Sequence, residues 1–144
     1  PEAMALIEEN CRFADYVRGS SEDFTYLFGT SDGEEIYEHH MKALCPNLIL
    51  TRGGDPVEIY TPSERLAFPV KKVETVSTIG AGDNFNAGFI YGITKARQEG
   101  AEMNVSDFAT MPVSAWQSLI KSGQRFSSAV CQSLNNYVDK DFPV

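Results

Sequence analysis

The sequence predicts an α/β domain in which helices pack against a β-sheet. Segments of strand and helix character follow one another in the order β-α-α-β-β-β-α-α. Residues 47–51 form a continuous apolar run of strand length, which is typical of a strand covered on both faces. Gly80 and Gly82 stand directly before a long pattern of helical period. The length of 144 residues suits one domain of this class.

The N-terminal elements are predicted from helix caps and short apolar runs. Residues 2–12 have a helical pattern, and we expect a short strand over residues 13–17. Ser20 or Ser21 begins the next helix, because hydroxyl side chains cap helix N-termini and the two carboxylates that follow favour the helix dipole. Gly29 ends this helix.

The middle of the chain is predicted to continue with a helix and then the sheet. The helix covers residues 33–44, with Ser31 or Asp32 as its cap, and Pro46 stops it. The buried strand at residues 47–51 follows. Two further strands, over residues 57–60 and 66–70, lie close together in the sequence and predict an antiparallel pair.

Two long helices complete the predicted fold. The first covers about residues 83–98, where Phe85 and Phe89 recur on one face. A polar linker at about residues 100–111 precedes the second helical pattern, which extends over residues 113–137 and contains a glycine that is expected to interrupt it.

Composition excludes several classes of function. With 42% hydrophobic and 11% aromatic residues the chain can bury a core, so disorder is not expected. The net charge of −8 argues against nucleic acid or an anionic membrane as the main partner. No apolar run is long enough to span a bilayer, and residues 1–9 lack the pattern of a signal peptide. Three widely spaced cysteines suit a reducing compartment, so we expect a cytoplasmic protein. Adjacent His39 and His40 are expected on a solvated helix face rather than at a metal.

The segment that carries chemistry is Gly80-Ala81-Gly82-Asp83. Two glycines one residue apart allow a tight backbone turn, and the first N–H groups of the following helix have no internal partner. Such a turn directs several N–H donors and the positive end of the helix dipole at one spot, which suits a phosphate group. Phe85 stands where the dinucleotide fingerprint needs its third glycine, and no Walker A lysine follows the turn.

Asp83 allows two interpretations. Its carboxylate can simply close the helix N-terminus, where the dipole favours the ionised form. It can also act as a base beside an anion-binding turn. Phosphoryl transfer tolerates a weak base, because its transition state is loose and catalysis depends mostly on positioning and charge stabilisation.

At this point a family resemblance becomes specific. The segment Thr78-Ile-Gly-Ala-Gly-Asp-Asn-Phe-Asn-Ala-Gly-Phe89 resembles the second signature of the PfkB (ribokinase-like) carbohydrate kinases. Residues 48–57 resemble that family's strand ending in Thr-x-Gly, and residues 14–24 resemble its strand followed by Asn-x-x-Glu. The resemblance covers nearly the whole chain but corresponds to the C-terminal half of a family member.

The resemblance implies a ribokinase-like three-layer α/β/α fold, of which residues 1–144 are the C-terminal nucleotide-binding and catalytic part. It implies ATP-dependent phosphorylation of a sugar hydroxyl, with Asp83 as the base that deprotonates the hydroxyl. The N–H groups of Gly80, Ala81 and Gly82 would form the anion hole. The residues expected beside ATP are Thr51, Gly53, Ser77 and Thr78, with adenine near residues 127–135.

Three departures from the family pattern affect the cofactors. Ser77 replaces the Asp that helps to bind potassium in cation-dependent relatives, which argues against a monovalent cation site. Ile79 replaces a Thr near the nucleotide. The Asn-x-x-Glu pair that organises Mg²⁺ through water is Ser20-x-x-Asp23 here, so only Asp23 keeps a carboxylate for that role. A helix cap with a first-turn acid explains Ser20 and Asp23 equally well.

The departures leave a second function class open, a non-catalytic nucleotide- or sugar-binding module on the same fold. The resemblance also places the sugar-binding residues and the lid in the N-terminal half, which this chain lacks. We therefore expect the chain alone to be inactive, with an exposed sheet edge or a partner that covers it. The expected partners are a small sugar and, in the full-length protein, a second copy of the same chain.

Overall fold

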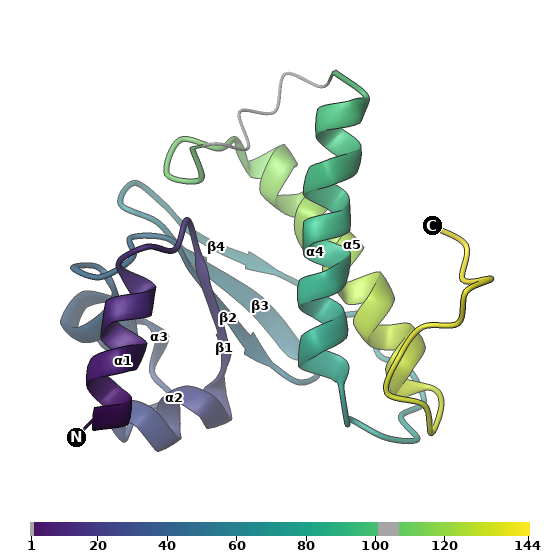
Figure 1. Cartoon of the computed structure of the whole chain (residues 1–144), viewed down its shortest axis with the longest axis horizontal. Helices are drawn as coiled ribbons and strands as arrows, with labels where there is room; N and C mark the ends of the chain where they lie inside the picture. The colour runs from purple at the N-terminus through teal and green to yellow at the C-terminus, as the bar shows by residue number, and fades with distance from the viewer. Residues whose placement is uncertain (1, 101–106) are drawn as a thin grey trace. The chain divides into compact units, whose positions relative to one another are not determined.

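The computed structural model describes residues 2–100 and 107–144, and the chain divides into two compact units. Unit 1 comprises Pro1–Pro69 with Asn104–Met111, and unit 2 comprises Val70–Met103 with Pro112–Val144. Figure 1 labels the elements. In chain order they are α1 (Glu2–Cys11), β1 (Val17–Ser20), α2 (Ser21–Phe28), α3 (Gly33–Ile36), the π-helical η1 (Tyr37–Met41), β2 (Leu48–Arg52), β3 (Asp55–Tyr60), β4 (Arg65–Phe68), α4 (Ala81–Gln98) and α5 (Val113–Cys131).

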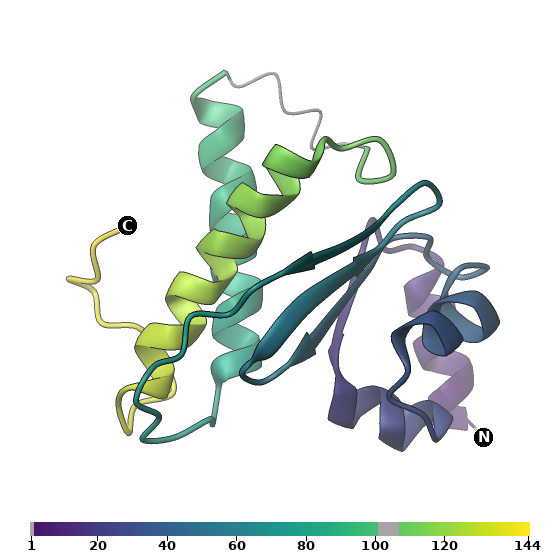
Figure 2. The same cartoon turned by 180° about the vertical axis from the view of Figure 1, so that it is seen from behind.

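Unit 1 contains a sheet in the order β1-β2-β3-β4 (Figure 2). β1 pairs with β2 in parallel, and the other two pairings are antiparallel. Leu48, Ile49 and Leu50 of β2 are each 0% exposed, which confirms the prediction of a strand covered on both faces. The antiparallel pair of β3 and β4 is confirmed as well.

The core of unit 1 lies where the helices that follow β1 pack on this sheet. Ile36 and Tyr37 are fully buried and pack in one cluster with Phe24, Cys45 and β2. Because Cys45 is buried, its thiol has a raised pKa, as expected for a cysteine that acts as a small apolar residue.

An arginine ties β4 to the helices of unit 1. Arg65 donates to both carboxylate oxygens of Glu34 at 2.9 and 3.0 Å and to Glu38 at 3.0 Å. Its guanidinium also lies 4.4 Å from the ring centre of Tyr37 and 5.2 Å from that of Tyr60. Bidentate and stacked contacts of this kind depend on the planar fork of arginine, so lysine would not replace it.

Unit 2 is built from α4 and α5, which pack along each other. Gly88 and Gly123 allow the close approach: a Cβ at Gly88 would lie 2.6 Å from the Ser122 carbonyl, and one at Gly123 would lie 3.0 Å from Phe85. The Ser122 hydroxyl donates to the Gly88 carbonyl at 2.6 Å.

The start of β1 differs from the prediction. The strand begins at Val17 instead of Phe13. Residues 12–14 instead continue from α1 as turns, in which the N–H groups of Arg12, Phe13 and Ala14 donate to carbonyls three or four residues earlier. Phe13 is 84% exposed, so its apolar side chain does not mark a strand that faces the core.

The last helix also differs from the prediction. α5 ends at Cys131, six residues before Tyr137, and Gly123 lies within it without interrupting it. Helix geometry is kept there because Gly123 faces Phe85 across the contact with α4. Part of the expected linker, residues 101–106, lies outside the described residues. Among the helices that the structure describes, none is long and apolar enough to cross a membrane.

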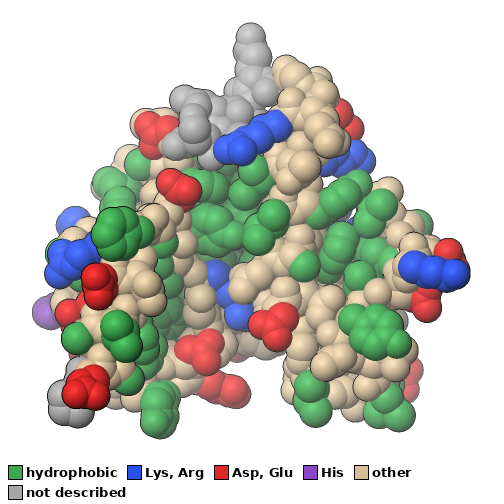
Figure 3. Space-filling view, in the orientation of Figure 1, with side chains coloured by type: hydrophobic (Ala, Val, Ile, Leu, Met, Phe, Trp, Pro, Cys, Tyr) green, Lys and Arg blue, Asp and Glu red, His purple; other side chains and the backbone are tan. Residues whose placement is uncertain are grey.

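Exposed hydrophobic side chains remain on both units, and Figure 3 shows hydrophobic surface among the charged groups. On unit 1, Phe13 is 84% exposed and Tyr26 is 90% exposed. On unit 2, Ile79 is 72% exposed and Leu134 is 85% exposed. The last two belong to the segments before α4 and after α5.

Candidate active site

The predicted turn begins α4 with a left-handed residue. Gly80 is the N-cap, with φ 78° and ψ 0°, a backbone conformation that residues with a Cβ rarely adopt. A Cβ at Gly80 would lie 2.8 Å from the backbone oxygen of Asn136. Glycine is therefore required here both for its conformation and for the close approach of the segment after α5.

Hydrogen bonds fix one peptide of the turn and leave the next donors available. The N–H of Ala81 donates to the Thr78 carbonyl at 3.1 Å. The N–H groups of Gly82 and Asp83 donate to no group within residues 2–100 and 107–144. These two donors lie in the first turn of a helix of 18 residues, where the dipole is positive. They are suited to an anion, and the exposed Asp83 carboxylate stands beside them.

The residues before the turn are tied to the end of α5. The N–H groups of Val76 and Ser77 both donate to the Cys131 carbonyl, at 2.7 and 3.2 Å. The Ser77 hydroxyl accepts from the N–H of Ile79 at 3.2 Å. The structure therefore brings Ser77 and Thr78 together with the turn in unit 2, beside the segment that follows α5.

The other predicted nucleotide residues lie in unit 1. Thr51 is the buried residue near the end of β2, and its hydroxyl accepts from Arg18 at 2.7 Å. Gly53 is in the turn that follows, with φ 59°. Ser20 at the end of β1 pairs in register with Thr51, so α2 and the Thr51–Gly53 turn begin at the same edge of the sheet.

Asp23 forms a capping box with Ser20 at the start of α2. The N–H of Asp23 donates to the Ser20 hydroxyl at 3.1 Å, and one Asp23 carboxylate oxygen accepts from the N–H of Ser20 at 2.8 Å. The hydrogen bond from the Ser20 backbone lowers the pKa of Asp23. The cap explains both residues, and it engages one oxygen of the carboxylate. In the part of the chain that is described, no group of three His, Cys, Asp or Glu could hold a metal ion.

Family comparison agrees with the motif. The model of the pfkB family carbohydrate kinases matches residues 1–138 of this chain. The chain belongs to this family.

Individual pfkB-family proteins show how far the likeness extends. A fructokinase from Rhizobium leguminosarum bv. trifolii is 29% identical over 90 residues, which are 62% of this chain and 28% of that protein. A ribokinase from Lactococcus lactis is 30% identical over 103 residues, which are 72% of this chain and 31% of that protein. The chain thus spans less than a third of the curated relatives that it matches.

Solved pfkB-type kinases share the fold. A fructokinase from Vibrio cholerae matches 94% of this chain and 40% of its own length with a TM-score of 0.77 at 22% identity. An aminoimidazole riboside kinase from Salmonella enterica matches 93% of this chain and 41% of its own length with a TM-score of 0.75 at 20% identity. The chain therefore has the ribokinase-like α/β fold over the portion that it covers.

Charge is divided unevenly between the two units of this pfkB-family chain. Unit 1 carries five Lys and Arg against fourteen Asp and Glu, a net charge of −9, whereas unit 2 carries seven against six, a net charge of +1. All of the acidic excess therefore belongs to unit 1. The unit with the Gly80–Asp83 turn does not by itself repel an anion.

Two candidate functional residues were not predicted from the sequence. Asn84, directly after Asp83, is only 8% exposed, and its amide bonds the Gly80 and Asn136 carbonyls. Arg18 holds the hydroxyl of Thr51. The Asn84–Asn136 and Arg18–Thr51 contacts join residues more than 30 positions apart, so no local sequence pattern predicts them. The sequence signal for Asn84 was a polar residue directly before the buried Phe85. His40 was predicted to lie on a solvated helix face. Its ring instead stacks on that of Phe28, with 4.1 Å between the ring centres.

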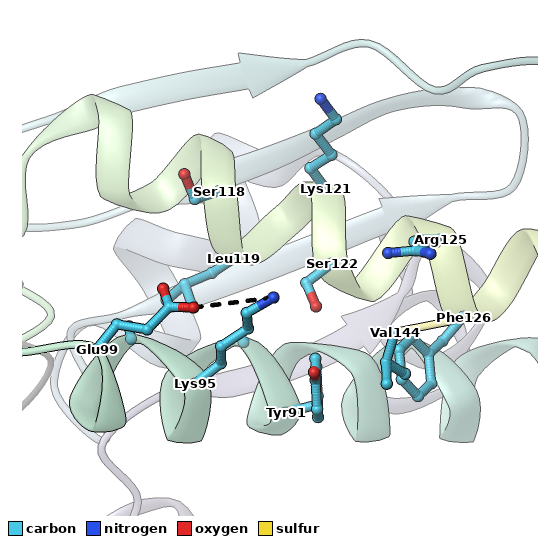
Figure 4. A pocket seen from close by; sticks show the side chains of 12 residues that line it. Tyr91, Lys95, Glu99, Ser118, Leu119, Lys121, Ser122, Arg125, Phe126 and Val144 are labelled. Carbon is cyan, nitrogen blue, oxygen red and sulfur yellow. Dashed lines mark ion pairs between the residues drawn. The ribbon is translucent and has the colours of Figure 1, made fainter. Parts of the chain in front are cut away.

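A hollow with a volume of about 340 Å³ lies between α4 and α5 (Figure 4). Three of its charged groups have partners: Lys95 pairs with Glu99 at 3.9 Å, and Arg125 donates to the Pro143 carbonyl. Lys121 points away from Lys95. None of the residues of the Gly80–Asp83 turn lines this hollow, and it is not assigned to the reaction.

The capping box predicts a pH-dependent stability. We expect Asp23→Asn to lower the free energy of unfolding by about 1 kcal/mol or less at neutral pH, because the carboxylate is mostly exposed. The folded-state pKa lies below the ordinary value of 3.8, so the contribution of the charge is present above pH 3.8 and is lost as the pH falls through the folded-state pKa. Urea unfolding of both proteins between pH 7 and pH 3 checks this, and a gap that widened on acidification would contradict it.

Proposed function

We propose that this chain is the nucleotide-binding and catalytic part of an ATP-dependent sugar kinase of the cytoplasm. The observation that carries the proposal is the start of α4, where two N–H groups without an acceptor in the described chain stand beside the exposed carboxylate of Asp83. Membership of the pfkB family supports this chemistry.

In the proposed reaction the sugar hydroxyl oxygen attacks the γ-phosphorus of ATP. A new bond forms between that oxygen and phosphorus, the bond to the bridging oxygen breaks, and ADP leaves. Asp83 accepts the hydroxyl proton, while the N–H groups of the turn stabilise the charge of the phosphoryl group in transfer. Of the donors first expected, the N–H groups of Gly80 and Gly82 have no acceptor within the described residues, and neither does that of Asp83, whereas the N–H of Ala81 is engaged with Thr78. Gly80 also shapes the turn through its left-handed conformation.

The residues proposed beside the nucleotide are those that match the family motifs. Thr51 and Gly53 would approach its phosphates or ribose, and Ser77 and Thr78 would lie beside it. The exposed apolar side chain of Ile79, near the segment that follows α5, suits the adenine ring. The Salmonella kinase was crystallised with an ATP analogue and the Vibrio fructokinase with ADP, which supports ATP as the donor.

Mg²⁺ is proposed to act with ATP, where it would neutralise phosphate charge. Only one residue of the chain was expected to help hold it. Asp23 keeps one carboxylate oxygen outside the capping box, which fits contact through water and no direct cage of ligands. A monovalent cation is not part of the proposal, because Ser77 lacks the carboxylate of cation-dependent relatives.

A non-catalytic binding module is the second candidate. It is favoured by Ile79, which is 72% exposed where the family has a hydroxyl, and by Ser20, whose hydroxyl is used in the helix cap. The retained Asp83 favours the kinase, because a carboxylate beside a triphosphate weakens binding and a module that only binds gains nothing from it.

The experiment compares the full-length protein that contains this chain with the 144-residue chain alone. Both are assayed with ATP, Mg²⁺ and fructose, ribose, ketodeoxygluconate or a nucleoside, and ATP binding is measured by calorimetry. We expect the full-length protein, which we propose to be a homodimer, to phosphorylate one of these substrates and the isolated chain to show no turnover. ATP binding without turnover in the full-length protein would favour the module, and normal turnover by the isolated chain would contradict the assignment of substrate binding to the missing part.

A further inference from the structure

Asn84 connects three parts of unit 2 through one side-chain nitrogen. Its Nδ2 donates to the Gly80 carbonyl at 2.9 Å and to the Asn136 carbonyl at 2.9 Å. The side chain is on α4, Gly80 belongs to the turn before that helix, and Asn136 belongs to the segment after α5. With Asn84 only 8% exposed, water does not readily replace these bonds.

The chemistry of the two partners favours a short, neutral amide at this position. Both are carbonyl oxygens, which only accept, so the side chain must offer two donors from one atom. Asparagine does this at the required length. An aspartate of the same shape would place a carboxylate against two carbonyls, and serine would offer only one donor.

The bonds fix the peptide that joins Gly80 to Ala81. Its carbonyl accepts from both the backbone N–H and the side chain of Asn84, each at 2.9 Å, and its N–H donates to Thr78. A peptide held at both ends cannot rotate without breaking these bonds. The N–H groups of Gly82 and Asp83, which come next in the chain, are thereby held in their orientation.

We infer that Asn84 is a positioning residue for phosphoryl transfer, because its amide fixes the turn that presents the N–H donors and holds the segment after α5 against it. This inference rests on the kinase function proposed above. Donors aimed in advance at developing charge need no reorganisation during the reaction, so loosening the turn should slow the chemical step more than it weakens ground-state binding.

The test uses full-length protein with three substitutions. Asn84→Ala removes both donors, and we expect kcat to fall about 10- to 100-fold while the KM values for ATP and sugar change less than about threefold. Asn84→Ser, which keeps one donor, should give an intermediate kcat. Ser122→Ala is the matched control, since it removes a bond of 2.6 Å from α5 to the Gly88 carbonyl of α4, away from the turn. It should lower thermal stability without lowering kcat.

Hydrogen exchange measured by mass spectrometry tests the contact independently of activity. In Asn84→Ala, peptides that cover residues 76–84 and 131–138 should exchange faster than in the wild type, and in Ser122→Ala they should not. Unchanged exchange would overturn the contact. Faster exchange with kcat within threefold of the wild type would overturn the positioning role. If the wild-type protein phosphorylates no substrate but Asn84→Ala still exchanges faster, the contact is supported and the proposed kinase function is overturned.

Discussion

Asp83→Asn should reduce kcat of the full-length protein by about 10²- to 10⁴-fold, the range that general-base catalysis usually contributes. The amide has the same shape as the carboxylate but cannot accept the proton of the sugar hydroxyl. ATP binding should be kept or slightly strengthened, because a negative charge is removed beside the N–H groups that meet the phosphates. Coupled assays of ADP release and calorimetric titration with ATP and Mg²⁺ give the two quantities.

Glu99→Gln is the control for this substitution. It makes the same change of carboxylate to amide next to the C-terminal end of α4, where Glu99 forms an exposed pair with Lys95 at 3.9 Å among the described residues. We expect kcat to stay within about twofold of the wild type, since exposed pairs contribute little. If Asp83→Asn were as mild as this control, the base would have to be another residue and the charge at Asp83 would serve only the helix terminus.

Local chemistry explains what could be predicted from the sequence. The helix cap at Ser20 or Ser21, the end of α2 at Gly29 and the turn at Gly80 were all predicted from residues close together in the sequence. The structure confirms these three helix ends within about two residues. The apolar composition of the β2 segment likewise predicted a strand that is buried on both faces.

Long-range contacts explain what could not be predicted. The start of β1 is decided by pairing of Val17 with Leu48 across 31 positions, so the apolar Phe13 nearby was misleading. Gly123 was interpreted as a helix breaker, whereas its lack of a side chain serves packing against Phe85. The Asn84–Asn136 contact spans 52 positions. In each case the residue type was visible in the sequence and its partner was not.

Gly80→Ala is expected to damage both stability and turnover. Alanine in the left-handed conformation costs about 1–2 kcal/mol. Its Cβ would also lie 2.8 Å from the Asn136 oxygen, and such an overlap with backbone usually costs about 1–3 kcal/mol because neither segment yields easily. Relief of the overlap would move the turn or the segment after α5, so the donors of Gly82 and Asp83 would shift. We therefore expect kcat to fall by about 10²-fold together with the loss of unfolding free energy.

Gly29→Ala separates strain from overlap. Gly29 has φ 76°, nearly the same as Gly80, but no atom lies within 4 Å of a Cβ built there. This control should lose only the 1–2 kcal/mol of left-handed strain and keep wild-type kcat, as measured by urea unfolding and the coupled assay. The excess loss in Gly80→Ala then measures how tightly the turn is held against Asn136. Equal losses of stability in the two variants, with kcat unchanged in both, would mean that the close approach at Gly80 has no part in positioning the anion-binding donors.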